Sequence, residues 1–213
     1  VYGEAGDDII IQNGSGSQTY DGGSGTDTLK VDTSGGWSTL NNSYPKFIEI
    51  NSITGIVGQV SNPNLRDTFI NIENLTYVGS FDTFLTGNEQ NNIILGSVGK
   101  DTLDGGAGND TLNGGTGDDT YHYTGEDGFD IITDTGGTDT IVFKSGYNIK
   151  APWKAPYRDG NNLVYVSENG KSGFTVVDHF SDTNKSIELF HYEGADGAAY
   201  SVKVRNSNSA VGD

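Results

Sequence analysis

The sequence predicts an all-β chain that folds as a parallel β-roll, a right-handed β-solenoid. The first observation is a nine-residue period over residues 87–122, in which glycine-rich turns alternate with short apolar segments. The second is that no window has the apolar spacing of an amphipathic helix. The third is the presence of 32 glycines, which would interrupt helices throughout the chain. Together these features indicate short stacked strands joined by turns.

The nine-residue units share one plan and fall into two blocks. Glycine is typical of the first, second and fourth places, an acidic or amide residue of the sixth, and an apolar residue of the eighth. Gln12 is a one-residue slip, and Tyr123-Thr124 is a two-residue insertion. The units are residues 3–11, 13–21 and 22–30, then a degraded unit at 78–86, and then 87–95, 96–104, 105–113, 114–122, 125–133 and 134–142.

The period divides the chain into a predicted roll and a predicted cap. Residues 1–142 form the roll, within which residues 31–70 lose the repeat and are expected to be an irregular, metal-free β segment. Residues 143–213 are expected to form a β-rich C-terminal cap, because a solenoid needs an atypical end to cover its open edge. Strands in the cap are predicted at 163–166, 174–177 and 187–190.

The strand half of each unit predicts the core. Two units complete one coil, so the same side of the roll returns every 18 residues. Side chains alternate along a strand, and the eighth residue of each unit therefore points inward. The predicted inward residues are Ile10, Leu29, Ile94, Leu103, Leu112, Tyr121, Ile132 and Ile141.

The turn half of each unit predicts cation sites. Glycines at the first, second and fourth places allow positive φ and let backbone carbonyls converge at little steric cost. Converging carbonyls beside an acidic sixth residue repel one another unless a cation lies among them. An all-oxygen ligand set with flexible geometry suits Ca²⁺ better than Mg²⁺. We therefore expect calcium in the turns, with binding coupled to folding.

Sixth residues pair one coil apart, and each pair predicts one ion. Five ions would take the formal charge of −17 to about −7. Asn92 keeps an amide oxygen that can ligate, whereas Thr83 makes its turn a doubtful site. The pairs are Asp8 with Asp27, Asn92 with Asp110, Asp101 with Asp119, Asp110 with Asp130, and Asp119 with Asp139.

Composition excludes several classes of function. The chain has 29 acidic and 12 basic residues, which argues against a nucleic-acid partner. It has no cysteine, so disulfides, thiolate metal sites and cysteine nucleophiles are ruled out. No apolar run is long enough for a transmembrane helix. No nucleophile elbow or phosphate loop occurs, and any catalytic domain is expected outside this span.

The stretch GGAGNDTLNGGTGDD at 105–119 resembles the RTX (repeats-in-toxin) family of bacterial proteins, and LTGN at 85–88 looks like the entry to RTX blocks in large surface adhesins. The resemblance covers roughly residues 3–30 and 71–142. It implies a secreted or cell-surface protein of a Gram-negative bacterium, exported by type I secretion. Such a chain stays unfolded at low cytoplasmic calcium and folds outside the cell. We expect a monomeric module of a larger chain.

The resemblance also implies a ligand set of backbone carbonyls and sixth-place carboxylates from two successive coils. Ser97, Gly99 and Asp101 would face Gly114, Thr116 and Asp119. Gly106, Gly108 and Asp110 would face Gly125, Asp127 and Asp130. The other implied ligands are Glu4, Gly6, Asp8, Gly22, Ser24, Asp27, Asn88, Gln90, Asn92, Gly105, Ala107, Gly115, Gly117, Asp134, Gly136 and Asp139.

The sequence thus predicts a calcium-dependent folding and structural module of a secreted RTX protein. The alternative is a glycan- or cell-surface-binding module held out on the roll. Trp153 and Tyr157 are candidate sugar contacts for that alternative, although core or cap packing is the favoured explanation for them. An ice-binding face is less favoured, because the threonine and asparagine positions form no unbroken outward rank.

Overall fold

The structure is a computed structural model, and it describes residues 1–12, 18–34, 47–59, 66–125, 127–144, 156–167, 170–181, 186–193 and 199–203. Strands and turns make up these residues, so the predicted all-β class is confirmed. Within the same ranges, no helix combines the length and apolar character needed to cross a membrane.

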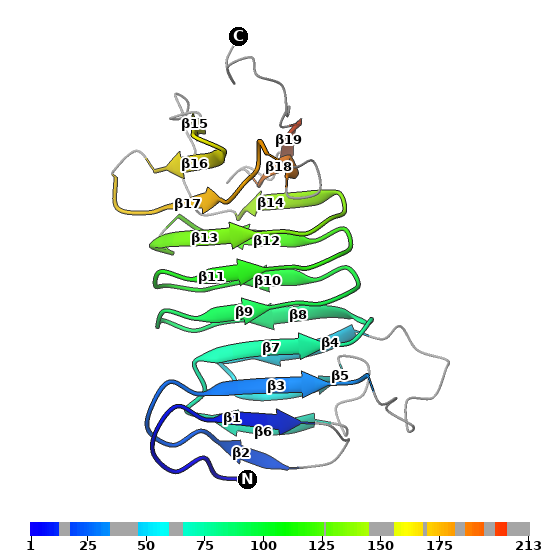
Figure 1. The fold of residues 1–213 in the computed structure, drawn as a ribbon, viewed down its shortest axis with the longest axis vertical. Helices are drawn as coiled ribbons and strands as arrows, with labels where there is room; N and C mark the ends of the chain where they lie inside the picture. Colours follow the sequence, from blue (N-terminus) through cyan, green and yellow to red (C-terminus); the bar gives the residue numbers. More distant parts are fainter. Residues whose placement is uncertain are drawn as a thin grey trace.

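Two sheets stack their strands along the length of the molecule, from the N-terminus at one end to the C-terminal strands at the other (Figure 1). The first sheet has the order β1 (Ile9–Gln12), β3 (Thr28–Asp32), β7 (Asn74–Val78), β9 (Ile93–Leu95), β11 (Thr111–Asn113), β13 (Phe129–Thr133), β17 (Gly173–Val176), β16 (Asn162–Val166) and β15 (Tyr157–Asp159). The second has the order β2 (Thr19–Asp21), β6 (Arg66–Ile70), β5 (Ile56–Gln59), β4 (Phe47–Asn51), β8 (Asp82–Thr86), β10 (Thr102–Asp104), β12 (Thr120–Tyr123), β14 (Asp139–Phe143), β18 (Ile187–Glu193) and β19 (Ala199–Lys203).

The strands of the repeat units pair in parallel and in register, which places equivalent residues directly above one another. In the second sheet, Leu85, Leu103, Tyr121 and Ile141 form one continuous inward column. The first sheet has the matching column, and all eight predicted inward residues are buried. Each coil is thin, so its stability depends on the apolar residues of the coils above and below it. The inward column of the first sheet is Ile10, Leu29, Leu75, Ile94, Leu112, Ile132 and Val176.

In the second sheet, the repeat is interrupted between β2 and β8. Residues 47–59 and 66–70 form three strands there, β4, β5 and β6. Strand β4 pairs in parallel with β8 above it, and β6 pairs in parallel with β2 below it. Strand β5 lies between β4 and β6 and is antiparallel to both. The repeat is lost here because a chain that reverses direction cannot keep the one-way, nine-residue path of a parallel coil.

The parallel coil ends where the C-terminal strands turn antiparallel. Strand β17 pairs in parallel with β13, but β16 and β15 then continue the first sheet as an antiparallel meander. Strand β18 caps the second sheet in the same way, followed by antiparallel β19. The strands expected in the cap are thus β16, β17 and β18. Aromatic side chains fill the junction with edge-to-face and stacked contacts: Tyr123, Phe143, Tyr165, Phe174, Phe190 and Tyr192.

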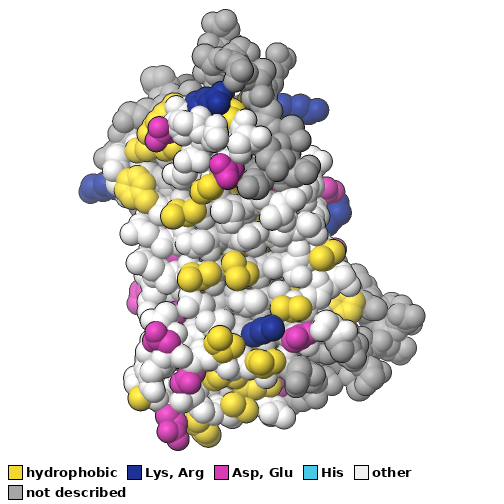
Figure 2. Space-filling model, viewed as in Figure 1, with side chains coloured by type: hydrophobic (Ala, Val, Ile, Leu, Met, Phe, Trp, Pro, Cys, Tyr) yellow, Lys and Arg dark blue, Asp and Glu magenta, His cyan; other side chains and the backbone are white. Residues whose placement is uncertain are grey.

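Much of the negative charge of this chain lies inside it. Of the 29 acidic residues, nine aspartates are buried in the described part of the chain. Figure 2 shows that acidic side chains on the viewed face are scattered, while hydrophobic side chains lie along its middle. Burying a carboxylate is costly unless it is paired or ligates a cation. The turns must therefore supply that compensation.

Candidate metal centre

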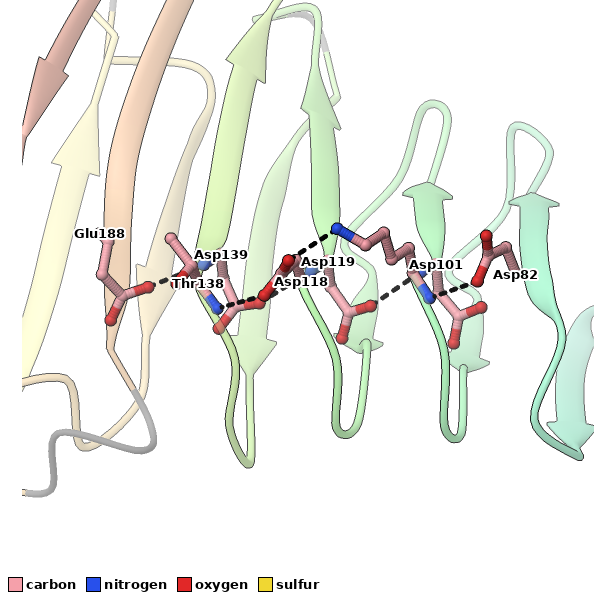
Figure 3. Close-up of polar contacts among 8 residues, drawn as sticks. Asp82, Asp101, Asp118, Asp119, Thr138, Asp139 and Glu188 are labelled. Carbon is pink, nitrogen blue, oxygen red and sulfur yellow. Dashed lines mark hydrogen bonds and ion pairs between the residues drawn. The ribbon is translucent and has the colours of Figure 1, made fainter.

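Sixth-place residues on the second-sheet side form a ladder of hydrogen bonds, which we call the second ladder. The backbone N–H of Asp101 donates to Oδ1 of Asp119 over 2.8 Å, and that of Asp119 donates to Oδ1 of Asp139 over 2.8 Å. Glu188 of β18 continues the ladder by accepting the N–H of Asp139 over 2.7 Å (Figure 3). At the other end, Thr83 donates both its N–H and its hydroxyl to Oδ1 of Asp101.

A matching first ladder lies on the first-sheet side. Asp8 donates its N–H to Asp27, Asn92 to Asp110, and Asp110 to Asp130, each to Oδ1 over 2.8 or 2.9 Å. All five pairs predicted from the sequence spacing are therefore brought into direct contact. Both ladders rest on parallel registry, since a carboxylate can reach the N–H of the preceding coil only when the turns are stacked.

The second carboxylate oxygen of these residues supports the presence of a cation. Oδ2 of Asp110 and Oδ2 of Asp119 are buried and have no hydrogen-bond partner, and the same holds for Oδ2 of Asp8, Asp27 and Asp139. A buried carboxylate oxygen without a partner is destabilising unless a positive charge lies next to it. Carboxylates beside backbone carbonyls give an all-oxygen donor set, which fits Ca²⁺.

The glycines of the turn explain where Oδ2 lies. A Cβ on Gly114 would come within 2.3 Å of Oδ2 of Asp119, and one on Gly105 within 2.2 Å of Oδ2 of Asp110. The first-place glycine is thus needed because the sixth-place carboxylate folds over it. Gly114 does not have positive φ, whereas Gly115 (104°) and Gly117 (134°) do. At the first place of this turn it is therefore space, and not φ, that selects glycine.

The implied carbonyl ligands lie in stacked turns. Thr116 donates its N–H to the carbonyl of Ser97, and Gly99 donates to the carbonyl of Thr116. Ser24 pairs with Glu4 and Gly6 in the same manner. Other carbonyls lie where a Cβ on a glycine of the next turn would collide with them: those of Asn88 at Gly106, Gln90 at Gly108, Gly99 at Gly117 and Gly108 at Gly128.

The densest group of carboxylates lies at the last turn of the second ladder. One carboxylate oxygen from each of Asp119, Asp134 and Asp139 lies within 4.8 Å of the others. All three side chains are buried. Tyr121 fixes this group from within the core, because its hydroxyl donates to Oδ2 of Asp134 over 2.6 Å and accepts the N–H of Gly114 over 2.8 Å.

Burial next to like charges perturbs these carboxyl groups strongly. Burial raises the pKa of Asp110 to about 6, that of Asp119 to about 7 and that of Asp130 to about 8. It also raises the pKa of Asp134 and Asp139, which face each other. The cause is desolvation in each case, and a bound divalent cation would oppose it by favouring the ionised form.

Three acidic residues of the ladders do not stand in nonapeptide units. Glu73 accepts the N–H of Asp27 over 2.8 Å, Asp67 accepts that of Gln18 over 2.8 Å, and Glu188 accepts that of Asp139. Sequence reasoning missed them because the residues that precede them in the sequence lack the glycine pattern. A shorter signal identifies all three, since each acid stands two residues before a buried apolar residue: Phe69, Leu75 or Phe190.

Other predicted residues lie apart from the ladders. The carboxylate of Asp127 is buried against Thr124, from which it accepts both the backbone N–H and the hydroxyl hydrogen bond. Ala107 is exposed at the tip of its turn. Tyr157 is exposed on strand β15 at the edge of the first sheet, and Trp153 lies outside the described residues.

Comparison with known proteins identifies the repeats. Residues 86–121 and 122–149 match the family model of the RTX calcium-binding nonapeptide repeat, a model of four copies. No curated protein matches the chain. This part of the chain is therefore similar to RTX calcium-binding repeats, for which the expected cation is Ca²⁺. Asp8 and Asp27 lie outside the match but make the same ladder contact.

Proposed function

We propose that this chain is a calcium-dependent folding and structural module of a type I secreted RTX protein, located outside the cell or on the surface of a Gram-negative bacterium. The observation that carries the proposal is the set of buried, unpaired Oδ2 atoms at Asp8, Asp27, Asp110, Asp119 and Asp139. Those atoms lie inside turns whose stacking forms the roll. The RTX match supports the secreted context, since the family is typical of secreted bacterial proteins.

The ladders explain how binding and folding would be coupled. Each sixth-place carboxylate accepts an N–H from the neighbouring coil and presents its second oxygen to its own turn. Bound calcium would neutralise the carboxylates and draw the carbonyls of both turns together. Without that charge, two acidic turns repel each other when they stack, so metal binding and coil formation favour each other. We propose at most one calcium ion for each of the five predicted pairs.

The test is a calcium titration of protein first treated with EDTA, followed by far-ultraviolet circular dichroism. We expect a cooperative change from a coil-like to a β spectrum with Ca²⁺, and no such change with Mg²⁺ at the same concentrations. The Mg²⁺ arm separates specific ligation from general screening of the charge. A β spectrum that does not respond to EDTA would contradict the proposal.

We propose a structural role for this span in place of a catalytic one, with any enzyme activity in other parts of the parent protein. Its support is that the densest carboxylate group belongs to the calcium ladders. The glycan-binding alternative stays a prediction. A glycan array with the calcium-loaded protein tests it, with Tyr157→Ala as the variant that should abolish any hit that uses the exposed β15 edge.

A further inference from the structure

The turn closed by Asn92 differs from the other turns of the first ladder in how its sixth-place side chain is used. Asn92 is buried, like Asp110 one coil above it. Its Oδ1 lies over Gly87 as Oδ2 of Asp110 lies over Gly105. However, Oδ1 of Asn92 accepts the N–H of Asn88 over 2.8 Å, whereas Oδ2 of Asp110 has no partner. The oxygen that would face a cation is already satisfied.

The amide nitrogen of Asn92 reverses the direction of the ladder. Where a carboxylate would accept from the preceding coil, Nδ2 donates to the backbone carbonyl of Glu73 over 2.6 Å. It also donates to Oδ1 of Asn88 over 3.1 Å. A flipped amide would place oxygen against oxygen at Glu73 and nitrogen against the N–H of Asn88. The partners therefore fix the orientation of the amide.

The adjacent turns of this level are also satisfied by protein donors. On the second ladder, Thr83 gives two hydrogen bonds to one oxygen of Asp101, and Ser97 donates its N–H to the other over 3.0 Å. On the first ladder, Asn74 accepts the N–H of Ile93 over 2.8 Å. Neutral hydrogen-bonding groups, both donors and acceptors, thus lie between the Asp8–Asp27 pair and the pairs above Asp101.

We propose that the carboxamide of Asn92 takes the place of a calcium ion, so that its turn binds no metal and separates an N-terminal calcium site from a C-terminal group of sites. The inference rests on the proposed function and refines it. A cation entering the turn would displace Nδ2 from two acceptors, and buried polar groups that lose their partners are destabilising. A carboxylate at the same place would have no hydrogen to donate and would require the ion.

The experiment counts bound calcium ions by native mass spectrometry of the whole chain, using Ca²⁺ as the probe. Asn92→Asp should bind one ion more than the wild type. Asn91→Asp is the matched control, because Asn91 is exposed. The substitution adds the same charge and keeps the side-chain oxygen that accepts the N–H of Asn109. The control should keep the wild-type count. An equal count for Asn92→Asp and wild type would overturn the proposal.

A second variant guards against a failure of Asn92→Asp to fold. Asn92→Ala removes the amide without adding a ligand, so it should keep the wild-type count while lowering the denaturation midpoint of the calcium-loaded protein. Loss of one ion in Asn92→Ala would identify Asn92 as a ligand and overturn the proposal. If the wild type and every variant bind no calcium, the proposed function itself fails, which is a different result from either outcome at Asn92.

Discussion

Two buried carboxylates in equivalent ladder positions, Asp67 near the N-terminal end and Asp119 in the repeat block, are neutralised differently. Asp67 accepts the N–H of Gln18 at Oδ1 and the side-chain amide of Gln12 at Oδ2, over 2.8 and 2.9 Å. Asp119 accepts one N–H at Oδ1, while its Oδ2 is buried without a partner. The same stacked geometry can therefore be completed by protein donors or by a cation, and only the second choice makes folding depend on calcium.

The largest expected effect is an inverted pH dependence in the metal-free protein. The pKa values of Asp110, Asp119 and Asp130 are raised to about 6, 7 and 8, above the value of about 4 for an unfolded aspartate. The fold therefore binds more protons than the unfolded chain, and its stability falls as pH rises from about 4 to 8. Circular dichroism in EDTA should show more β structure at pH 5 than at pH 8.

The calcium-loaded protein is the control for that experiment. Ligation requires ionised carboxylates, so its stability should rise with pH over the same range. A metal-free protein that gains β structure as pH rises would mean that the carboxylates of the repeat block are already satisfied, as Asp67 is.

Asp119→Ala should have the next largest effect, because Asp119 contacts both Asp101 and Asp139. We expect the calcium midpoint of folding to rise by roughly tenfold or more, equivalent to about 1.4 kcal/mol. The neighbour Asp118 is exposed and pairs with Lys100 over 2.7 Å, so Asp118→Ala should leave the calcium midpoint close to that of the wild type, because exposed ion pairs contribute little to stability. Calcium titrations followed by circular dichroism measure the midpoint of both variants. Equal shifts of the midpoint would contradict the role of Asp119 in linking two ladder contacts.

Tyr121→Phe should lower the stability of the loaded protein by about 1–3 kcal/mol, since it leaves Gly114 and Asp134 without a buried partner. The ring and its packing are kept, so the loss reports the hydroxyl alone. Urea denaturation with saturating calcium measures it. Tyr123→Phe provides the comparison, because the Tyr123 ring packs in the aromatic junction with Phe143, Tyr165 and Phe174. A smaller loss at Tyr121 than at Tyr123 would contradict the assigned role.

The smallest expected effect concerns the first turn, where Glu4 has a φ of 76° at a place that glycine holds in other units. Glu4→Gly should stabilise the protein by about 0.5–1 kcal/mol, because a side chain at positive φ is strained. Gly23→Ala should do the opposite, since its Cβ would lie 2.0 Å from the carbonyl oxygen of Glu4. Thermal denaturation in calcium distinguishes them, and a destabilised Glu4→Gly would mean that the Glu4 side chain has a role of its own.

The sequence by itself determined the repeated part of this protein. A local rule of nine residues sets the turn, the strand and the inward residue of each unit. The buried repeat residues of both inward columns and the five ladder pairs therefore followed from spacing. Parallel stacking only shifts each coil along the axis of the roll. Residues that are equivalent in the sequence repeat therefore stay next to each other in the structure.

The tertiary structure alone decided the features that depend on contacts between segments without a common period. Glu73 and Glu188 join the ladders although the sequence before them lacks the glycine pattern, because β7 and β18 pair with neighbouring strands and so position the backbone around them. The same holds for the choice between amide and cation at Asn92, which depends on the direction of its Nδ2 toward Glu73. A residue type gives a list of donors and acceptors, and only packing decides which of them meet.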